Sequence, residues 1–412
     1  MKNPTPRPRI PVYFNDHYCS PAIVFETFKK SESIATAIAL NSDLSASLEV
    51  LDPARSTDDL HLATSEIEQY VDEEYVQAVK TGQPAHLAES NGLGWDENLW
   101  NSVLHSTAGI LRAIDDVASG APVAASLSSG LHHATPNHGS GYCTINSLAV
   151  GALFAARRGL KVAILDLDAH CGGGTEAFLR QFPDVASKIL HVDVSIIPFD
   201  RYEPRASGSW LRIATRDSYL TDLDQALTKV LAAKPDLVIY NAGVDIWPSV
   251  DEDIVRKREA RVAKTIISNG IGCVIVMAGG YGPDHDIVPL HLSTLEAFAK
   301  ARVEFDKIMA LLAKAWKGPN LSIEPSSRTR VWAAQAKADL DHGPDSCPHC
   351  QGKVVPLIFG FPSEASWKLI RRGEAVAGGC VFLGPYVATH TCLRCGERFG
   401  RRPVGSNPER AS

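Results

Sequence analysis

The sequence lacks an apolar run that could span a membrane, since no stretch reaches the roughly 18 consecutive apolar residues that such a helix needs. Its first residues, MKNPTPRPRIP, are basic but broken by prolines, and they contain no apolar segment typical of a secretory signal. Cysteine is sparse and unevenly spaced, with nine in 412 residues, which argues against a disulfide scaffold. These absences predict a cytoplasmic protein with no membrane partner.

A positive net charge is also missing. The chain has 41 Lys and Arg against 47 Asp and Glu, a net charge of -6, which argues against a protein that coats nucleic acid. The part from Pro344 onward is net basic, whereas residues 1–343 taken together are net acidic. Because 45% of the residues are hydrophobic, the chain can bury a large core, and its length suggests a principal domain of roughly 300 residues with a smaller module attached.

Changes in composition divide the chain into five parts. The first and last are polar or proline-rich and are expected to be flexible. A stretch rich in proline and serine is expected to be a linker or strap between two folded parts. The proposed boundaries are a flexible arm at 1–10, the principal domain at 11–317, the linker at 318–343, a small cysteine-containing module at 344–402 and a flexible tail at 403–412.

The principal domain shows two patterns of apolar residues. Between Val12 and Gly130 they recur every three or four positions, which predicts a helical outer layer. Farther along, four continuous apolar runs alternate with helical segments. Such runs are typical of a parallel sheet covered by helices on both faces, which is the predicted α/β fold. The runs are KVAILDLD, KILHVDVSI, PDLVIYNAG and GCVIVMAGG.

Polar residues gather where these strands should end, at the edge where open α/β sheets bind ligands. Asp168 and His170 follow the first strand, and Asp245 follows the third. Two carboxylates and one imidazole suit Zn²⁺ or Fe²⁺ and leave room for water and substrate. Asp166 should lie close to this set without necessarily binding the metal. Any one of these residues could instead be a cap or turn residue, but three strand ends together favour a metal site.

Three further residues suggest proton transfer and stabilisation of negative charge near that metal. His132 and His133 are adjacent, and neutral histidines beside a metal can take a proton from water and give one to a leaving nitrogen. Taken alone, a histidine is more often an ordinary core or surface residue. Tyr281 follows two glycines, which permit a sharp turn and direct the phenol toward developing negative charge.

These motifs together resemble the zinc-dependent histone deacetylase superfamily, which includes acetylpolyamine amidohydrolases and acetoin-utilisation proteins. The motifs GLHHA, GYC, DLDAH followed by GGGT, YNAGVDI and AGGY occur in its order and approximate spacing, over residues 10–315. DLDAH and VIYNAGVDI are most similar to the class IV branch.

The resemblance implies an arginase-like open α/β fold and assigns a role to each matching position. The implied roles are metal ligands at Asp168, His170 and Asp245, acid/base histidines at His132 and His133, an oxyanion-stabilising tyrosine at Tyr281, an acyl tunnel lined by Gly141 and Tyr142, and an acid at Asp166 that supports His132 and helps bind a monovalent cation such as K⁺.

The sequence departs from the family pattern at three points. SSGLHHA lacks the usual proline-glycine pair before the histidines, and Cys171 replaces a histidine or glutamine. Gly173 replaces the Asp or Asn that normally orients the second histidine. From this we expect His133 to lack its partner, and the corresponding hypothesis makes His132 the dominant base and His133 a weakly tuned acid.

The small module contains two CxxC pairs, whose four thiolates would form a closed tetrahedral site for a structural zinc ion. With so little core, such a module would need the metal to fold. The segment between the pairs is similar to small bacterial zinc-ribbon proteins, which suggests a bacterial source and a docking role toward a protein partner. The predicted zinc ligands are Cys347, Cys350, Cys392 and Cys395.

The combined interpretation is a zinc-dependent amidohydrolase, a deacetylase or deacylase, acting on acyl-lysine, an acylpolyamine or another N-acyl small molecule. One alternative is a catalytically weakened protein that binds such ligands without efficient turnover, which the absent partner at Gly173 would favour. Ureohydrolase activity is a third reading, but that chemistry needs additional carboxylates for two metals.

Overall fold

The computed structural model describes residues 9–19 and 29–315 and parts of the C-terminal module. In that module it describes 346–347, 351–359, 369, 372, 374–379, 386–387, 390–393, 398–399 and 402–403. The predicted linker at 318–343 lies outside the described residues, as do Cys350 and Cys395. The large domain and the C-terminal module are separate compact units and are treated one at a time.

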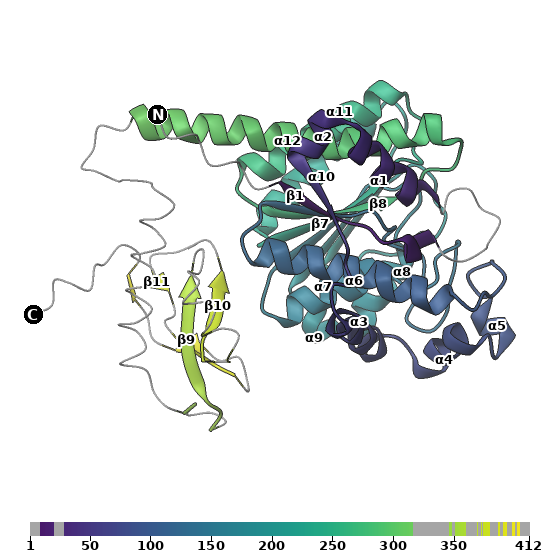
Figure 1. Ribbon diagram of the computed structural model, residues 1–412, viewed down its shortest axis with the longest axis horizontal. Helices are drawn as coiled ribbons and strands as arrows, with labels where there is room; N and C mark the ends of the chain where they lie inside the picture. Colours follow the sequence, from purple (N-terminus) through teal and green to yellow (C-terminus); the bar gives the residue numbers. More distant parts are fainter. Residues whose placement is uncertain are drawn as a thin grey trace, which may run out of the picture. The chain divides into compact units, whose positions relative to one another are not determined.

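The large domain is built on one sheet of eight parallel strands with helices on both faces, which confirms the predicted fold class (Figure 1). The spatial order is β2-β1-β3-β8-β7-β4-β5-β6. The strands are β1 (Ile10–Tyr13), β2 (Leu48–Leu51), β3 (Val123–Ser126), β4 (Val162–Asp166), β5 (Ile189–Ser195), β6 (Ser209–Ile213), β7 (Leu237–Gly243) and β8 (Gly272–Ala278).

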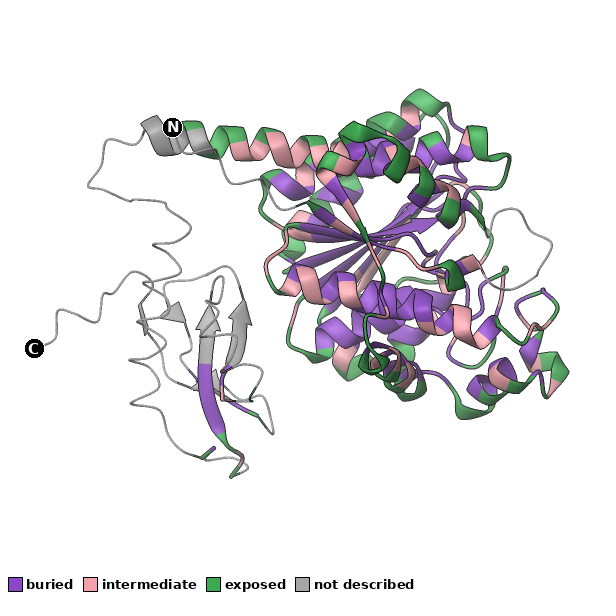
Figure 2. Cartoon of the chain, in the orientation of Figure 1, coloured by how far each residue is buried: buried purple, intermediate pink, exposed green. Residues whose placement is uncertain are grey.

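Two layers of helices cover the sheet, and alternate residues of each central strand face one layer or the other. On β7, Val238 and Tyr240 belong to one core and Leu237 and Ile239 to the other. The strands are therefore buried on both sides, as Figure 2 shows. One layer contains α1 (Lys30–Leu40), α2 (Ser42–Ser47), α10 (Tyr219–Ala233), α11 (Glu252–Ser268) and α12 (Asp284–Ala315); the other contains α3 (Thr57–Tyr70), α4 (Glu73–Thr81), α6 (Leu99–Ala118), α7 (Ser147–Arg157), α8 (Gly173–Gln181) and α9 (Pro183–Ala186). A short helix α5 (Ala85–Ala88) and a 3-10 turn at Asp16–Cys19 complete the domain.

The first 130 residues differ from the purely helical layer that was expected. They do form helices, but they also supply β1, β2 and β3 at one side of the sheet. Each of these strands has only four residues, so its alternation is too short to be separated from the helical periodicity around it. β6 was likewise not predicted, because it is an edge strand with polar residues and lacks a continuous apolar run.

A buried arginine holds the strand ends that carry the predicted metal ligands. Arg258 on α11 is fully buried, and its guanidinium donates to the backbone oxygens of Leu167 (3.0 Å) and Gly243 (2.6 Å). Leu167 precedes Asp168, and Gly243 lies two residues before Asp245. Its counter-charge is Glu259, which also accepts a hydrogen bond from Tyr240 (2.9 Å).

Replacing Glu259 by glutamine should lower the free energy of unfolding by about 3–5 kcal/mol, because it leaves a buried guanidinium without its counter-charge. Urea titration followed by circular dichroism measures the change. Glu252→Gln on the same helix is the matched control: Glu252 and Arg256 form an exposed i,i+4 pair, and its loss should cost only about 0.3–0.5 kcal/mol. Equal effects of the two substitutions would contradict the role given to Arg258.

The C-terminal module has a small sheet in the order β10-β9-β12-β13, from β9 (Val354–Phe359), β10 (Val376–Gly379), β12 (His390–Cys392) and β13 (Arg398–Phe399). A separate pair joins β11 (Tyr386–Val387) and β14 (Arg402–Pro403). Cys347 and Cys392, one from each CxxC pair, are buried together with Val354. Among the described residues of the whole chain, no helix has the length and apolarity required to cross a bilayer.

Candidate functional site

The predicted metal ligands meet at the carboxyl ends of β4 and β7. His170 Nδ1 lies 3.1 Å from Asp168 Oδ1 and 3.1 Å from Asp245 Oδ2. The ligand atoms of this set lie within 4.8 Å of one another. Two ligands of a tetrahedral zinc ion with bonds of 2.0–2.2 Å are separated by about 3.4 Å, so these distances fit such an ion. Asp245 Oδ2 is buried without a hydrogen-bond donor, as expected for a carboxylate oxygen that binds a cation.

Asp166 lies beside this set and supports the first histidine, as the family resemblance implied. Its Oδ2 accepts from His132 Nδ1 at 2.8 Å, and its Oδ1 accepts from Asn241 Nδ2 at 2.9 Å. His132 Nε2 is 3.5 Å from Asp168 Oδ1. Burial alone would lower the pKa of His132, but Asp166 and Asp168 outweigh that effect and raise the pKa well above its ordinary value. In this environment His132 holds its proton firmly.

The expectation that His133 lacks an orienting partner is wrong. Asp200, in the loop after β5, accepts from His133 Nδ1 at 2.9 Å, and the same oxygen accepts from the Gly174 backbone N–H at 3.0 Å. Burial and the neighbouring His132 lower the pKa of His133, although Asp200 acts in the opposite direction. His133 therefore remains neutral at pH 7, with its Nδ1 proton held by Asp200 and its Nε2 lone pair available.

Gly173 makes room for this relocated carboxylate. A Cβ atom at Gly173 would lie 2.2 Å from Asp200 Oδ1 and 2.4 Å from the Asp200 backbone oxygen. An Asp or Asn at position 173 is thus incompatible with Asp200 in its observed position. Asp200 itself has φ 58°, a left-handed conformation that aspartate and asparagine adopt more readily than most residues. The carboxylate that orients His133 therefore comes from position 200 and not from position 173.

Asp200→Asn should reduce kcat by about 10–100-fold, the usual cost of losing an outer partner of a reacting histidine. It should also move the acidic limb of kcat/KM to lower pH, because the lost carboxylate no longer raises the pKa of His133. The pH dependence of kcat/KM measures both effects. The double variant Gly173→Asp/Asp200→Gly should recover part of the rate, whereas Gly173→Asp alone should not. An unchanged pH profile in Asp200→Asn would contradict this role.

Tyr281 is placed by the two glycines before it. Gly279 and Gly280 have φ of 56° and 87°, and a Cβ at Gly279 would lie 2.4 Å from Asp245 Oδ1. Side chains are thus excluded at a turn packed directly on a predicted ligand. Tyr281 is 50% exposed and borders the same cavity as both histidines. Partial burial, together with Asp168 and Asp245, raises its pKa well above the ordinary value, so the phenol keeps its proton.

Aromatic side chains form the rim of the site. Gly141 packs against the ring of His133, where a Cβ would approach within 2.5 Å, and Tyr142 is 46% exposed. Phe199, which the sequence analysis did not identify, is 49% exposed and packs edge-on against His133 with ring centroids 5.0 Å apart. Its position directly before Asp200, in a loop after a strand end, was the only available signal.

Both histidines, Tyr142 and Tyr281 line a cavity of about 120 Å³. Its lining also includes several serines, among them Ser31, Ser102, Ser106 and Ser128. Lys30, another residue that the sequence analysis missed, is buried there and donates to the backbone oxygen of Gly279. Burial lowers its pKa to about 8, against the opposing effect of Asp245 and Asp168. The cavity lining therefore includes serine hydroxyls and one buried amine beside its apolar residues.

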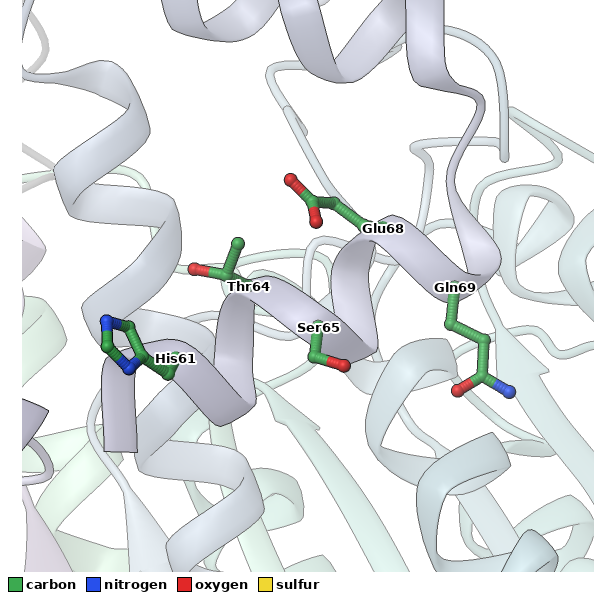
Figure 3. A pocket seen from close by; sticks show the side chains of 5 residues that line it. All are labelled: His61, Thr64, Ser65, Glu68 and Gln69. Atoms are coloured by element: carbon green, nitrogen blue, oxygen red, sulfur yellow. The ribbon is translucent and has the colours of Figure 1, made fainter. Parts of the chain in front are cut away.

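A second hollow, of about 490 Å³, lies along α3 and does not contain the strand-end residues (Figure 3). It is lined by His61, Thr64, Ser65, Glu68 and Gln69. Glu68 is paired with Lys80 at 2.8 Å, and Gln69 accepts from Arg157. Its polar groups therefore serve surface interactions, and the chemistry is concentrated at the strand-end site.

Comparison with known proteins agrees with this geometry. The family described as histone deacetylase domain matches residues 27–290. An uncharacterized protein of Picosynechococcus sp. is 31% identical over 231 residues, covering 53% of this chain and 76% of that protein. Histone deacetylase 2 of Arabidopsis thaliana is 33% identical over 172 residues, covering 38% of this chain but only 44% of that protein. The crystal structure of an acetylpolyamine aminohydrolase from Burkholderia pseudomallei aligns with a TM-score of 0.55 at 19% identity, covering 71% of this chain and 99% of that one.

Proposed function

Because the chain belongs to the histone deacetylase domain family and its strand-end ligand set is complete, we propose that it is a zinc-dependent amidohydrolase that cleaves the amide bond of an N-acylated amine. The observation that carries the proposal is the meeting of Asp168, His170 and Asp245 beside two oriented histidines. When bound, a zinc ion supplies two effects at neutral pH: it acidifies a water molecule and polarises the amide carbonyl.

The two histidines form a proton chain with a direction. Asp166 accepts from His132 Nδ1, and His132 Nε2 lies 3.1 Å from His133 Nε2. Since the pKa of His132 is raised and that of His133 is lowered, His132 is the proton donor in this contact. We therefore assign His133 as the general base, whose Nε2 lone pair takes a proton from the attacking water once that water replaces the contact with His132. His132 is the positive charge beside it. This reverses the hypothesis drawn from Gly173.

Tyr281 and His133 act on the two ends of the reacting group. The Tyr281 phenol, which keeps its proton, donates a hydrogen bond to the carbonyl oxygen as negative charge develops there. His133, once protonated, gives its proton to the departing nitrogen, so the products are a carboxylate and an amine. The oriented partner at Asp200 removes the main argument for a weakened binding protein, which rested on its absence.

The shape of the site supports a linear N-acyl chain as substrate. The exposed Tyr142 ring lines the cavity that contains the histidines, and the exposed Phe199 ring packs against His133. The matched proteins include enzymes named acetylpolyamine amidohydrolase, from Mycoplana ramosa among others. Acyl-lysine, an acylpolyamine and a small N-acyl amide all present the same scissile bond. We propose this class of linear amides without choosing a single amine.

A panel of an acetyl-lysine peptide, acetylated polyamines and small N-acyl amides tests the function. The zinc-loaded chain should hydrolyse at least one of them, and chelation should remove the activity. Tyr281→Phe should keep its metal but lose about 10²–10³-fold in kcat, the usual cost of removing one oxyanion donor. Hydrolysis that survives both chelation and Tyr281→Phe would refute the mechanism.

We further propose that the C-terminal module is a zinc ribbon held by Cys347, Cys350, Cys392 and Cys395. The burial of Cys347 and Cys392 in one cluster supports it. Hydrogen bonds from Cys347 N to Gly352 O (2.8 Å) and from Gln351 N to Cys347 O (2.8 Å) turn the chain back at the first pair. Such a turn suits a knuckle whose two thiolates point to one ion.

A further inference from the structure

A second group of metal-ligating side chains lies on β5, behind Asp166. His191, Asp193 and Ser195 alternate along the strand and so share one face of the sheet. Asp166, His191 and Asp193 are all fully buried, and one ligand atom of each lies within 4.8 Å of the others. Asp166 also supports His132, but neither the family comparison nor the proposed mechanism assigns a role to His191 or Asp193.

His191 is the feature that points to a ligand. It is 0% exposed, and neither ring nitrogen makes a hydrogen bond. Buried imidazole nitrogens normally have a partner, because leaving them unsatisfied costs about 1–3 kcal/mol each. Glu176 Oε2, itself buried and without a hydrogen-bond donor, lies 3.5 Å from His191 Nδ1. Glu176 can accept the Nδ1 proton, which leaves the Nε2 lone pair free for a cation, as in carboxylate–histidine–metal arrangements.

Gly172 leaves space between the ligand atoms. A Cβ there would lie 2.8 Å from Asp166 Oδ2 and 3.2 Å from His191 Nε2. The side chain that would fill this gap is absent. Asp193 is fixed at its other side, where its Oδ2 accepts from Gly172 N at 2.8 Å and its Oδ1 accepts from Ser195. Asp166 Oδ2 and the two oxygens of Asp193 each accept one described hydrogen bond, so each keeps a lone pair that a cation can use.

The charges of the group also require a cation. Two fully buried carboxylates, Asp166 and Asp193, are costly without compensation. His132 compensates Asp166 through a direct hydrogen bond, but the hydrogen bonds that the structure describes for Asp193 come only from a backbone N–H and a hydroxyl. Arg205, the nearby guanidinium, is engaged with Glu176 at 3.0 Å. Asp193 is thus left without a full counter-charge.

We propose that Asp166, His191 and Asp193 bind a second divalent transition-metal ion, such as Mn²⁺ or Zn²⁺, with Glu176 orienting His191. The donor set, one imidazole nitrogen and two carboxylates, is that of a divalent ion and not of K⁺, which takes oxygen ligands. The ion would lie between Asp166 at the end of β4 and His191 and Asp193 on β5, and it would hold these two strands together at the edge where the active site forms. It shares Asp166 with the proposed active site, but its binding does not depend on amide hydrolysis, in which His191 and Asp193 take no part.

Mn²⁺ titration by calorimetry tests this site, because Mn²⁺ favours carboxylate and imidazole over the thiolates of the C-terminal module. The full-length chain carrying Asp245→Ala, which removes a ligand of the catalytic set, should still bind one Mn²⁺. Adding Asp193→Asn or His191→Phe should weaken that binding by more than about 100-fold, since even an outer partner costs 10–100-fold. Asp59→Asn is the control: Asp59 is also a buried carboxylate, but it pairs with Arg112 on other helices.

Each result of these measurements either supports a divalent-ion site or overturns it. The absence of Mn²⁺ binding in Asp245→Ala, or equal binding after Asp193→Asn, overturns the proposal. Thermal stabilisation of Asp245→Ala by KCl but not by MnCl₂ overturns it in favour of a monovalent ion. Circular dichroism shows whether His191→Phe folds. If it does not, the isosteric variant Asp193→Asn tests the proposal. No substrate is present in these measurements, so failure of the proposed hydrolysis leaves the result intact.

Discussion

Asp168→Ala should lower the rate of amide hydrolysis by more than about 10³-fold, because the metal it helps to hold supplies several kcal/mol of transition-state stabilisation. Asp168 is buried, and its Oδ1 faces His170 Nδ1 and His132 Nε2 at 3.1 and 3.5 Å. The variant loses one of two negative ligands, and the remaining set is too weakly charged to retain the ion. Metal analysis should therefore find one divalent ion fewer per chain.

In Asp168→Ala the rate on the best substrate of the panel and the metal content should both fall. Circular dichroism should show an unchanged fold. Asp251→Ala is the matched control, because Asp251 is an exposed carboxylate whose ion pair with Arg216 lies on the surface. It should keep both rate and metal. A variant of Asp168 that retained full activity would end the case for a catalytic metal at this site.

His133→Ala should lower kcat by about 10²–10⁴-fold, the usual contribution of a general base. The structure singles out His133 over His132 because its pKa is lowered, so it is the neutral imidazole of the pair at pH 7. His132→Ala removes a positive charge and not the base, so its effect should be smaller. Single-turnover rates of the two variants on the same substrate measure the difference.

The pH dependence of kcat/KM tests which of the two histidines is the base. A base with a pKa below the ordinary histidine value of 6.5 is lost only when the pH falls below that value, so the acidic limb of wild-type kcat/KM should lie below pH 6.5. Above it the base is unprotonated and the rate should not depend on His133. The limb should disappear in His133→Ala and persist in His132→Ala. The opposite result would identify His132 as the base, as the hypothesis drawn from Gly173 states.

The sequence predicted the central strands of the sheet and the metal-ligating residue types that follow them. Continuous apolar runs predicted β4, β5, β7 and β8, because parallel strands buried on both faces need apolar residues at every position. The rule that loops at strand ends converge then predicted that Asp168, His170 and Asp245 meet. It could not predict β1, β2 and β3, whose four residues give too little pattern.

The partner of His133 shows why some site residues escape sequence reasoning. Gly173 occupies the position where the family pattern has the orienting Asp or Asn, so its lack of a carboxylate predicted a missing partner. The structure supplies the carboxylate from Asp200, 67 residues away from His133 along the chain. Lys30 reaches the same site from a different helix, 249 residues from Gly279. Spacing along the sequence carries no information on such contacts.

By itself the sequence determined the fold class, the ligand types at the strand ends and the paired histidines, because those follow from local patterns and from the edge at which parallel strands end. Only the tertiary structure decided which carboxylate orients His133, which histidine keeps its proton, and that His191 and Asp193 face Asp166 across the space left by Gly172. These depend on distances between segments remote in the chain and on the burial that sets each group's charge, and packing fixes both.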